Sequence, residues 1–283
     1  MKSMSSPVSA KEAVLTEEWG NKKRALGRPS VLYACRLALL IASVVIWQAM
    51  SGTLVPEFFI SRPSAILERL YEWTVDGSLF YNGAITAAEA LLGFLIGSAC
   101  GLFLAILLGR SALLSGVLNP FIMAFYSLPK VALAPLFILW IGIGFPMKVI
   151  LTATIVFFLV FLNTYTGVCG VSRELVAIVN LMGATEGQVL RKVVIPSALT
   201  WMFAGLRISV PYALIGAVVG ELMASNRGLG SMLISAQGQF DTAGVFGALI
   251  AISALSFLLN AAVKFAEVKS MPWQTKNAEE IRI

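Results

Sequence analysis

Side chains that could carry out chemistry are few in this chain and are spread along it. There is no histidine among the 283 residues, which removes the usual general base, the commonest metal ligand and the ordinary serine or cysteine triad. Cys35, Cys100 and Cys169 are far apart, and each lies in or beside an apolar run. We therefore expect no catalytic residue, no metal site and no cofactor.

Nucleotide chemistry is also not encoded here. The sequence has no GxxxxGK[ST] loop to hold phosphates, so another chain must bind ATP if ATP powers this protein. An integral membrane enzyme would need acid and base groups, and no clustered Asp or Glu pair is present to supply them.

The composition predicts an all-α, polytopic membrane protein. Hydrophobic residues make up 58% of the chain and charged residues 13%, and several apolar runs approach the roughly 20 residues that cross a bilayer as a helix. Six spans are predicted, at 31–54, 84–108, 118–141, 147–168, 200–223 and 244–266. Residues 31–266 would form the transmembrane domain, between polar tails at 1–30 and 267–283.

The net charge of +6 is explained by basic residues that set the orientation in the membrane, and not by nucleic-acid binding. Basic residues flank the spans and concentrate in alternate loops, which is the pattern that sets membrane topology. They lie in the first tail, at Arg110, in the Arg173–Lys192 region and in the last tail. This asymmetry predicts that both termini are cytoplasmic.

Glycine and proline predict how some spans pack. Small residues recur every four positions along the second span, so another helix can approach it closely; they are Gly93, Gly97, Gly101, Ala105 and Gly109. The third span contains Pro120, Pro129 and Pro135, which predict a broken helix. Broken backbone of this kind can line a translocation path, and a kink held by neighbouring helices is the alternative.

The most informative segment is polar and lies between two apolar spans, at 170–198. Ser172 can cap a helix with apolar residues on one face, which ends at Gly183. Thr185 and Gln188 form a possible capping box for a second helix, which Pro196 is expected to stop. Such a hairpin could dock in a groove of a soluble partner and transmit its movement to the spans.

A few polar side chains are candidates for the translocation path. Lys130 follows Pro129 in the broken span and could attract an anion, or it could snorkel or pair with a carboxylate. Arg207 could face the inner mouth or bind lipid phosphate. Asn163 and Ser209 offer neutral groups, whose commoner use is hydrogen bonding between helices. Glu89 and Glu221 are weak candidates as ligands.

Two shorter amphipathic stretches accompany the spans. Residues 55–83 include a helical pattern suited to the membrane surface, and residues 225–242 could form a short re-entrant or surface helix.

The segment at 170–198 resembles the signature of the membrane subunits of ATP-binding-cassette importers. Gly183 is followed after nine residues by Val193, and then by Ile195 and Pro196, in the spacing of that signature. Where the signature has Glu-Ala-Ala, this chain has Ala177, Ile178 and Val179, so Glu174 is the candidate for the acidic contact. The resemblance implies that Ala184, Thr185, Glu186 and Arg191 also belong to the contact with the ATPase.

Other stretches resemble the subgroup that imports nitrate, taurine and other sulfonates. These are SLPKVALAPLFILWIGIG at 127–144, GATEGQVLRKVVIP at 183–196, AGLRISVPYALIGAVVGEL at 204–222 and RGLG at 227–230. The resemblance implies the type I importer fold, a homodimer in the bacterial inner membrane, a cytoplasmic ATPase and an extracytoplasmic binding protein. It implies a small anion as the solute, with bicarbonate, an aromatic carboxylate or a pyrimidine precursor as alternatives. The rival mechanism is an ion-coupled secondary transporter, which would need carboxylates at the membrane midplane, and Glu89 alone is a thin basis for it.

Overall fold

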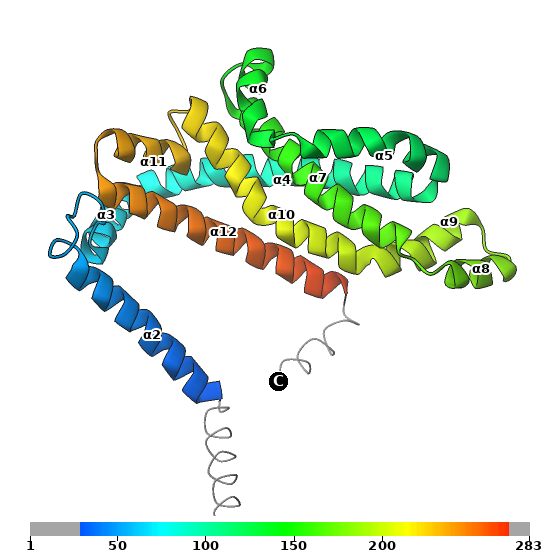
Figure 1. The fold of residues 1–283 in the computed structure, drawn as a ribbon, viewed down its shortest axis with the longest axis horizontal. Helices are drawn as coiled ribbons and strands as arrows, with labels where there is room; N and C mark the ends of the chain where they lie inside the picture. Colours follow the sequence, from blue (N-terminus) through cyan, green and yellow to red (C-terminus); the bar gives the residue numbers. More distant parts are fainter. Residues whose placement is uncertain (1–28, 272–283) are drawn as a thin grey trace, which may run out of the picture. The chain divides into compact units, whose positions relative to one another are not determined.

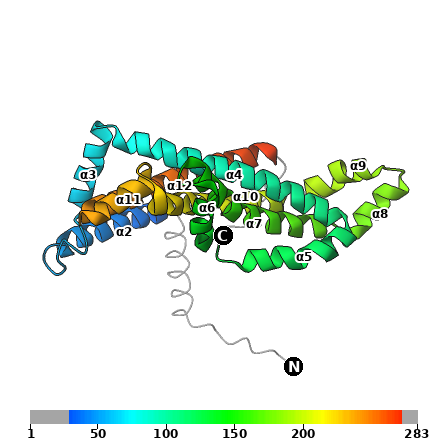
Figure 2. The same cartoon turned by 90° about the horizontal axis from the view of Figure 1, so that it is seen from above.

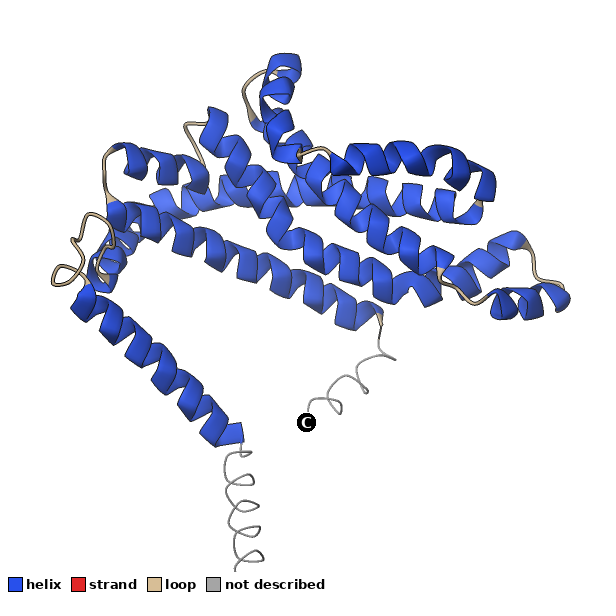
Figure 3. Ribbon diagram, in the orientation of Figure 1, coloured by secondary structure: helices blue, strands red, loops and turns tan. Residues whose placement is uncertain are grey.

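The computed structural model describes residues 29–271, and the regular structure of this range is helical (Figure 3). Five helices are long and apolar enough to cross a membrane, and a bent pair makes a sixth candidate span. The five are α2 (Pro29–Met50), α4 (Ser78–Arg110), α7 (Phe145–Cys169), α10 (Ile195–Ala224) and α12 (Thr242–Ser270). The prediction of an all-α protein with about six spans is therefore confirmed, with the bent pair at the place of the third predicted span. The tail residues 1–28 and 272–283 lie outside the described range.

Shorter helices connect the long ones, and the bent pair comprises α5, the 3₁₀ turn η1 and α6. The two predicted short helices are present as α3 and α11. The shorter elements are α3 (Pro63–Val75), α5 (Ala112–Ser127), η1 (Lys130–Leu133), α6 (Ala134–Ile141), α8 (Arg173–Leu181), α9 (Glu186–Val189), the π-helical turn η2 (Leu190–Val194) and α11 (Leu229–Gly238).

The chain divides into two compact units, one ending at Ala65 and the other beginning at Ile66. The first unit holds α2. Near the C-terminal end of α2, the Gln48 side chain donates a hydrogen bond to the Ser64 hydroxyl and accepts one from the Ser64 backbone N–H, both at 3.1 Å. The second unit holds α4 to α12 and carries the features discussed below.

Helix α7 is the centre of the second unit. It lies alongside α4 and α10 (Figures 1 and 2). In its apolar membrane-spanning stretch 56% is buried, a larger share than in any other of the five long helices. The glycines of α4 from Gly93 onward face it: an added Cβ would lie 2.5 Å from Thr152 at Gly93 and 2.4 Å from the Ala153 carbonyl oxygen at Gly97. The predicted small-residue face is therefore a close-packing seam.

The third span is broken, as predicted, but only one of its three prolines marks the break. The segments Leu113–Ser127 and Lys130–Ile141 meet at 85°, and Leu128 is extended immediately before Pro129. Pro120 lies inside α5, and Pro135 lies in the first turn of α6. A proline in a first turn lacks only an N–H that has no partner within the helix, so Pro135 does not interrupt α6.

Gly97→Ala should destabilise the protein, because its methyl group would collide with the backbone of α7 rather than with a movable side chain. Overpacking of this kind costs about 1–3 kcal/mol. Gly116→Ala on α5 is the control, because no atom lies within 4 Å of its added methyl group and alanine favours helix by roughly 1 kcal/mol over glycine. In thermal unfolding in detergent, Gly97→Ala should lower the midpoint temperature relative to the wild-type protein, and Gly116→Ala should raise it. Equal midpoint temperatures for the two variants would contradict close packing of α4 on α7.

Candidate functional site

The candidate site is the polar segment 170–198, here called the coupling segment. It includes α8, α9 and η2, and in the second unit α8 and α9 lie at the opposite end from α11 (Figure 1). Ser172 caps α8 by accepting a hydrogen bond from the Leu175 N–H at 3.4 Å. Glu174 in the first turn also suits the positive end of the helix. The expected start of the first helix is confirmed.

The turn after α8 is built as the sequence predicts. Gly183 has φ +82°, a left-handed conformation that side-chain-bearing residues rarely adopt. The Ala184 N–H bonds to the Val179 carbonyl at 3.2 Å and so closes the end of α8. Thr185 and Gln188 then form the complete capping box at the start of α9.

The expected stop at Pro196 is wrong. Helix α9 continues through η2 into α10, and Pro196 lies in the first turn of α10. The wider π turn accommodates a residue that has no N–H and whose ring would clash in a regular α-helix interior. The segment is therefore one free helix, α8, attached through a tight turn to the end of a helical rod that extends over Glu186–Ala224.

The apolar face of α8 is exposed. Leu175 and Ile178 are 51% and 54% exposed, and Leu181 and Met182 at its end are 89% and 81% exposed. The predicted polar contact residues Glu174, Thr185, Glu186 and Arg191 are exposed as well. Pro196 is also exposed, and Ala184 is partly buried. Exposed apolar side chains rimmed by charges are typical of a protein interaction surface.

A hollow of about 350 Å³ separates α8 from the ends of the long helices. Arg110, in the last turn of α4, reaches across to Glu186 at 3.2 Å. Because Glu186 is 93% exposed, this ion pair contributes little stability. Val176 and Asn180 line the hollow from the other face of α8, opposite the exposed end residues.

Lys130 lies in η1 at the break of the third span. Its ammonium group donates to the Tyr126 carbonyl and lies 4.2 Å from the ring centre of Tyr126 and 5.0 Å from that of Phe158. Within residues 29–271, the ammonium group thus contacts a carbonyl and two aromatic faces rather than a carboxylate. Such contacts hold a cation without neutralising its charge.

The other expected path residues have different surroundings. Asn163 donates to the Leu159 carbonyl at 2.8 Å, and Ser209 is fully buried and donates to the Leu206 carbonyl at 2.9 Å. Arg207 forms an ion pair with Glu267 of α12. Asn163 and Ser209 are thus satisfied within their own helices and Arg207 by a neighbouring helix, so a role in a path stays a prediction for all three.

One group of charges was not foreseen as a group. Glu89, Lys148 and Glu221 come from α4, α7 and α10 and are at most 4% exposed. Lys148 forms an ion pair with Glu89, and Glu221 lies at the start of α11, whose Gly230 N–H donates to it at 2.6 Å. The only available signal was that each charge interrupts an apolar run, where charges are costly.

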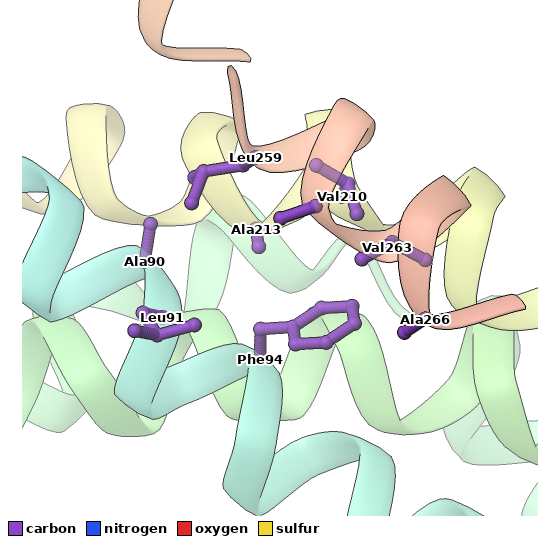
Figure 4. A pocket seen from close by; sticks show the side chains of 9 residues that line it. Ala90, Leu91, Phe94, Val210, Ala213, Leu259, Val263 and Ala266 are labelled. Atoms are coloured by element: carbon purple, nitrogen blue, oxygen red, sulfur yellow. The ribbon is translucent and has the colours of Figure 1, made fainter. Parts of the chain in front are cut away.

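A second hollow is apolar and offers nothing to a polar solute. It measures about 180 Å³ and lies among α4, α10 and α12 (Figure 4). Its lining is made of alanine, leucine and valine side chains together with Phe94. Without a hydrogen-bonding side chain, it cannot recognise an anion.

Known proteins resemble this chain in sequence over most of its length. A family model described as "Binding-protein-dependent transport system inner membrane component" matches residues 97–269. A putative aliphatic sulfonates transport permease protein of Bacillus subtilis is 33% identical over 245 residues, covering 86% of this chain and 89% of that protein. A formylaminopyrimidine transport permease protein of Halalkalibacterium halodurans is 33% identical over 234 residues, covering 82% and 93%.

The fold also matches a solved structure. A chain of the MetNI methionine ABC transporter in an inward-facing conformation superposes with a TM-score of 0.55 at 20% identity. The match covers 71% of this chain and 95% of that chain. At this identity the likeness shows the fold alone.

Proposed function

The chain belongs to the inner membrane components of binding-protein-dependent transport systems, and from this premise we propose which surface receives the driving force and which solute passes. It is a multi-pass membrane permease of an ABC importer, with the type I fold, and it is not the ATPase. A permease of this kind works with an ATP-hydrolysing subunit and a binding protein.

The ATPase docks on the exposed face of α8. The main support is that α8, a capped helix at the end of the continuous helix Glu186–Ala224, exposes its apolar side chains. These are Leu175, Ile178, Leu181 and Met182. A groove in the ATPase would bury these side chains, while Glu174 and Arg191 fix the register by charge. This assignment places the coupling segment and both termini in the cytoplasm, in agreement with the distribution of basic residues.

The transported solute is a small anion, with an aliphatic sulfonate, taurine or nitrate as the first candidates. Lys130 supports this choice, because no carboxylate of residues 29–271 forms an ion pair with it and it lies where the third span is broken. The Bacillus subtilis relative is named for aliphatic sulfonates. The formylaminopyrimidine relative is equally similar, so a pyrimidine precursor is the alternative that the transport assay must include.

The protein acts as a homodimer, with the path between the two copies and the broken third span beside it. An ion-coupled mechanism would need an accessible carboxylate within the membrane. Glu89, on which that alternative rests, is buried and paired with Lys148. The ATP-driven mechanism therefore accounts for more of the structure.

Leu181→Asp should abolish co-purification with the ATPase while leaving the permease stable. The side chain is already 89% exposed, so the change costs the free protein little, whereas a carboxylate buried in an apolar groove is strongly unfavourable. Asn180→Asp adds the same charge one residue away, on the side of the hollow, and is the matched control. Equal retention of the ATPase by both variants would remove this face from the interface.

Gly183→Val should uncouple the transporter without preventing membrane insertion. A β-branched residue at φ +82° is strained by about 1–2 kcal/mol, so the turn would reshape and α8 would dock incorrectly. The measurement is binding-protein-stimulated ATPase activity of the purified complex. Gly187→Val, which also enters open space but at an ordinary backbone conformation, is the control; full stimulation in Gly183→Val would make the bend dispensable.

Lys130→Met should lower anion uptake by on the order of ten-fold or more, because the attraction of one charge for an anion about 4 Å away amounts to ~1–4 kcal/mol. Uptake by reconstituted complex is compared for a sulfonate, nitrate and a neutral pyrimidine. Lys264→Met, an exposed cation on α12, is the control. Wild-type uptake of every anion by Lys130→Met would remove this residue from the path.

A further inference from the structure

The buried charges of Glu89, Lys148 and Glu221 lie beneath the start of α11, and we call these three residues the buried triad. They join three membrane-spanning helices at the end of the second unit that is remote from the coupling segment (Figure 1). Each charge within an apolar span carries a cost of several kcal/mol unless it is compensated. The compensating contacts indicate what the triad does.

Glu221 caps a helix that is not its own. One carboxylate oxygen accepts the Gly230 N–H of α11 at 2.6 Å, and the other accepts the hydroxyl of Thr86 from α4 at 2.7 Å. Thr86 in turn accepts the Leu229 N–H at 2.8 Å. Negative charge and hydrogen-bond acceptors at a helix start are both stabilising.

A third N–H group at the start of α11 also donates its hydrogen bond to a side chain of another helix. The Gly228 N–H bonds to the side-chain oxygen of Asn82 on α4 at 2.8 Å. The first N–H groups of α11 are thus satisfied by side chains of α4 and α10, although Leu229 is only 2% exposed and water has little access. A buried helix start with three donors matched in this way is fixed in position.

Glycines let the backbone approach Glu221 closely. A Cβ at Gly228 would lie 2.0 Å from the carboxylate, and one at Gly230 would lie 2.8 Å from it. Lys148 fits in the same manner, because a Cβ at Gly220 would lie 2.7 Å from its side chain. The Lys148 ammonium pairs with Glu89 and donates to Ser225, at 3.1 Å, in the connection to α11.

We propose that Glu221 is a positioning residue that locks α11 onto α4 and α10, braced by Lys148 and Glu89, so that this end of the permease moves as one body during transport. Helix α11 is then a fixed part of the wall and not a lid. The proposal rests on the proposed function only in that it concerns the transport cycle.

The test is hydrogen–deuterium exchange of the peptide region 225–239 in the complete transporter, without nucleotide and trapped with ATP and vanadate. Wild-type exchange at Gly228, Leu229 and Gly230 should be equally slow in both states. Faster exchange in one state would show that α11 detaches as a lid, and would overturn the proposal. This comparison requires no variant, so it stands even if a substitution prevents folding.

Two variants test the cap itself. Glu221→Ala should speed exchange at Gly230 by on the order of ten-fold or more, because this buried N–H loses its acceptor. Exchange at Leu229 should rise less, because its acceptor Thr86 stays in place but loses its own bond to Glu221. Glu221→Gln, which keeps one acceptor oxygen, should be intermediate. Glu72→Gln on α3 removes a carboxylate that pairs with Arg69 and should leave this exchange unchanged. If Glu221→Ala exchanged these amides at the wild-type rate, Glu221 would not be the cap of α11.

The brace is tested by removing charges singly and together. Lys148→Met leaves two buried carboxylates near each other and should also speed exchange, whereas Lys148→Met combined with Glu89→Gln should restore much of the protection. Unchanged exchange in the single variant would remove Lys148 from the proposal. Because exchange in the Glu221, Lys148 and Glu89 variants is measured without nucleotide, its outcome is separate from loss of ATPase binding, which would count against the proposed function alone.

Discussion

The close approach of α4 and α10 to α7 is the constraint on which the other features depend. Between helices in a hydrocarbon environment, association comes from van der Waals contact and hydrogen bonds rather than from the hydrophobic effect. Thr152 shows how tight this contact is, because Gly93 of α4 and Gly216 of α10 both abut it. A side chain in place of either glycine would separate the helices and with them the groups that they carry.

The two ends of this packed unit are built for different tasks. At one end, donors and acceptors from three helices are paired in a buried setting around Glu221. At the other end, α8 presents its apolar residues to the surroundings and is joined to α9 by the tight turn at Gly183. A rigid body with one incomplete surface is suited to being moved by a partner that completes it.

Much of this was accessible from the sequence because the signals are local. Apolar length predicts the spans, and Ser172, Gly183 and the Thr185–Gln188 pair predict the ends of α8 and the start of α9, since caps act within one turn. The continuous rod was missed because Pro196 was interpreted as a stop, and a π turn leaves no mark in residue propensities. The buried triad was missed because its members are far apart in the chain and only tertiary packing unites them.

The π turn at Leu190–Val194 has a consequence for the evolution of this segment. Each residue added to or removed from an α-helix turns everything beyond it by about 100°. The wide turn lies between the membrane-spanning part of the rod and α8, so it sets the direction in which α8 points. Homologous chains that gain or lose one residue in this turn would point α8 in a different direction from the one proposed to meet the partner, so insertions here should be rare.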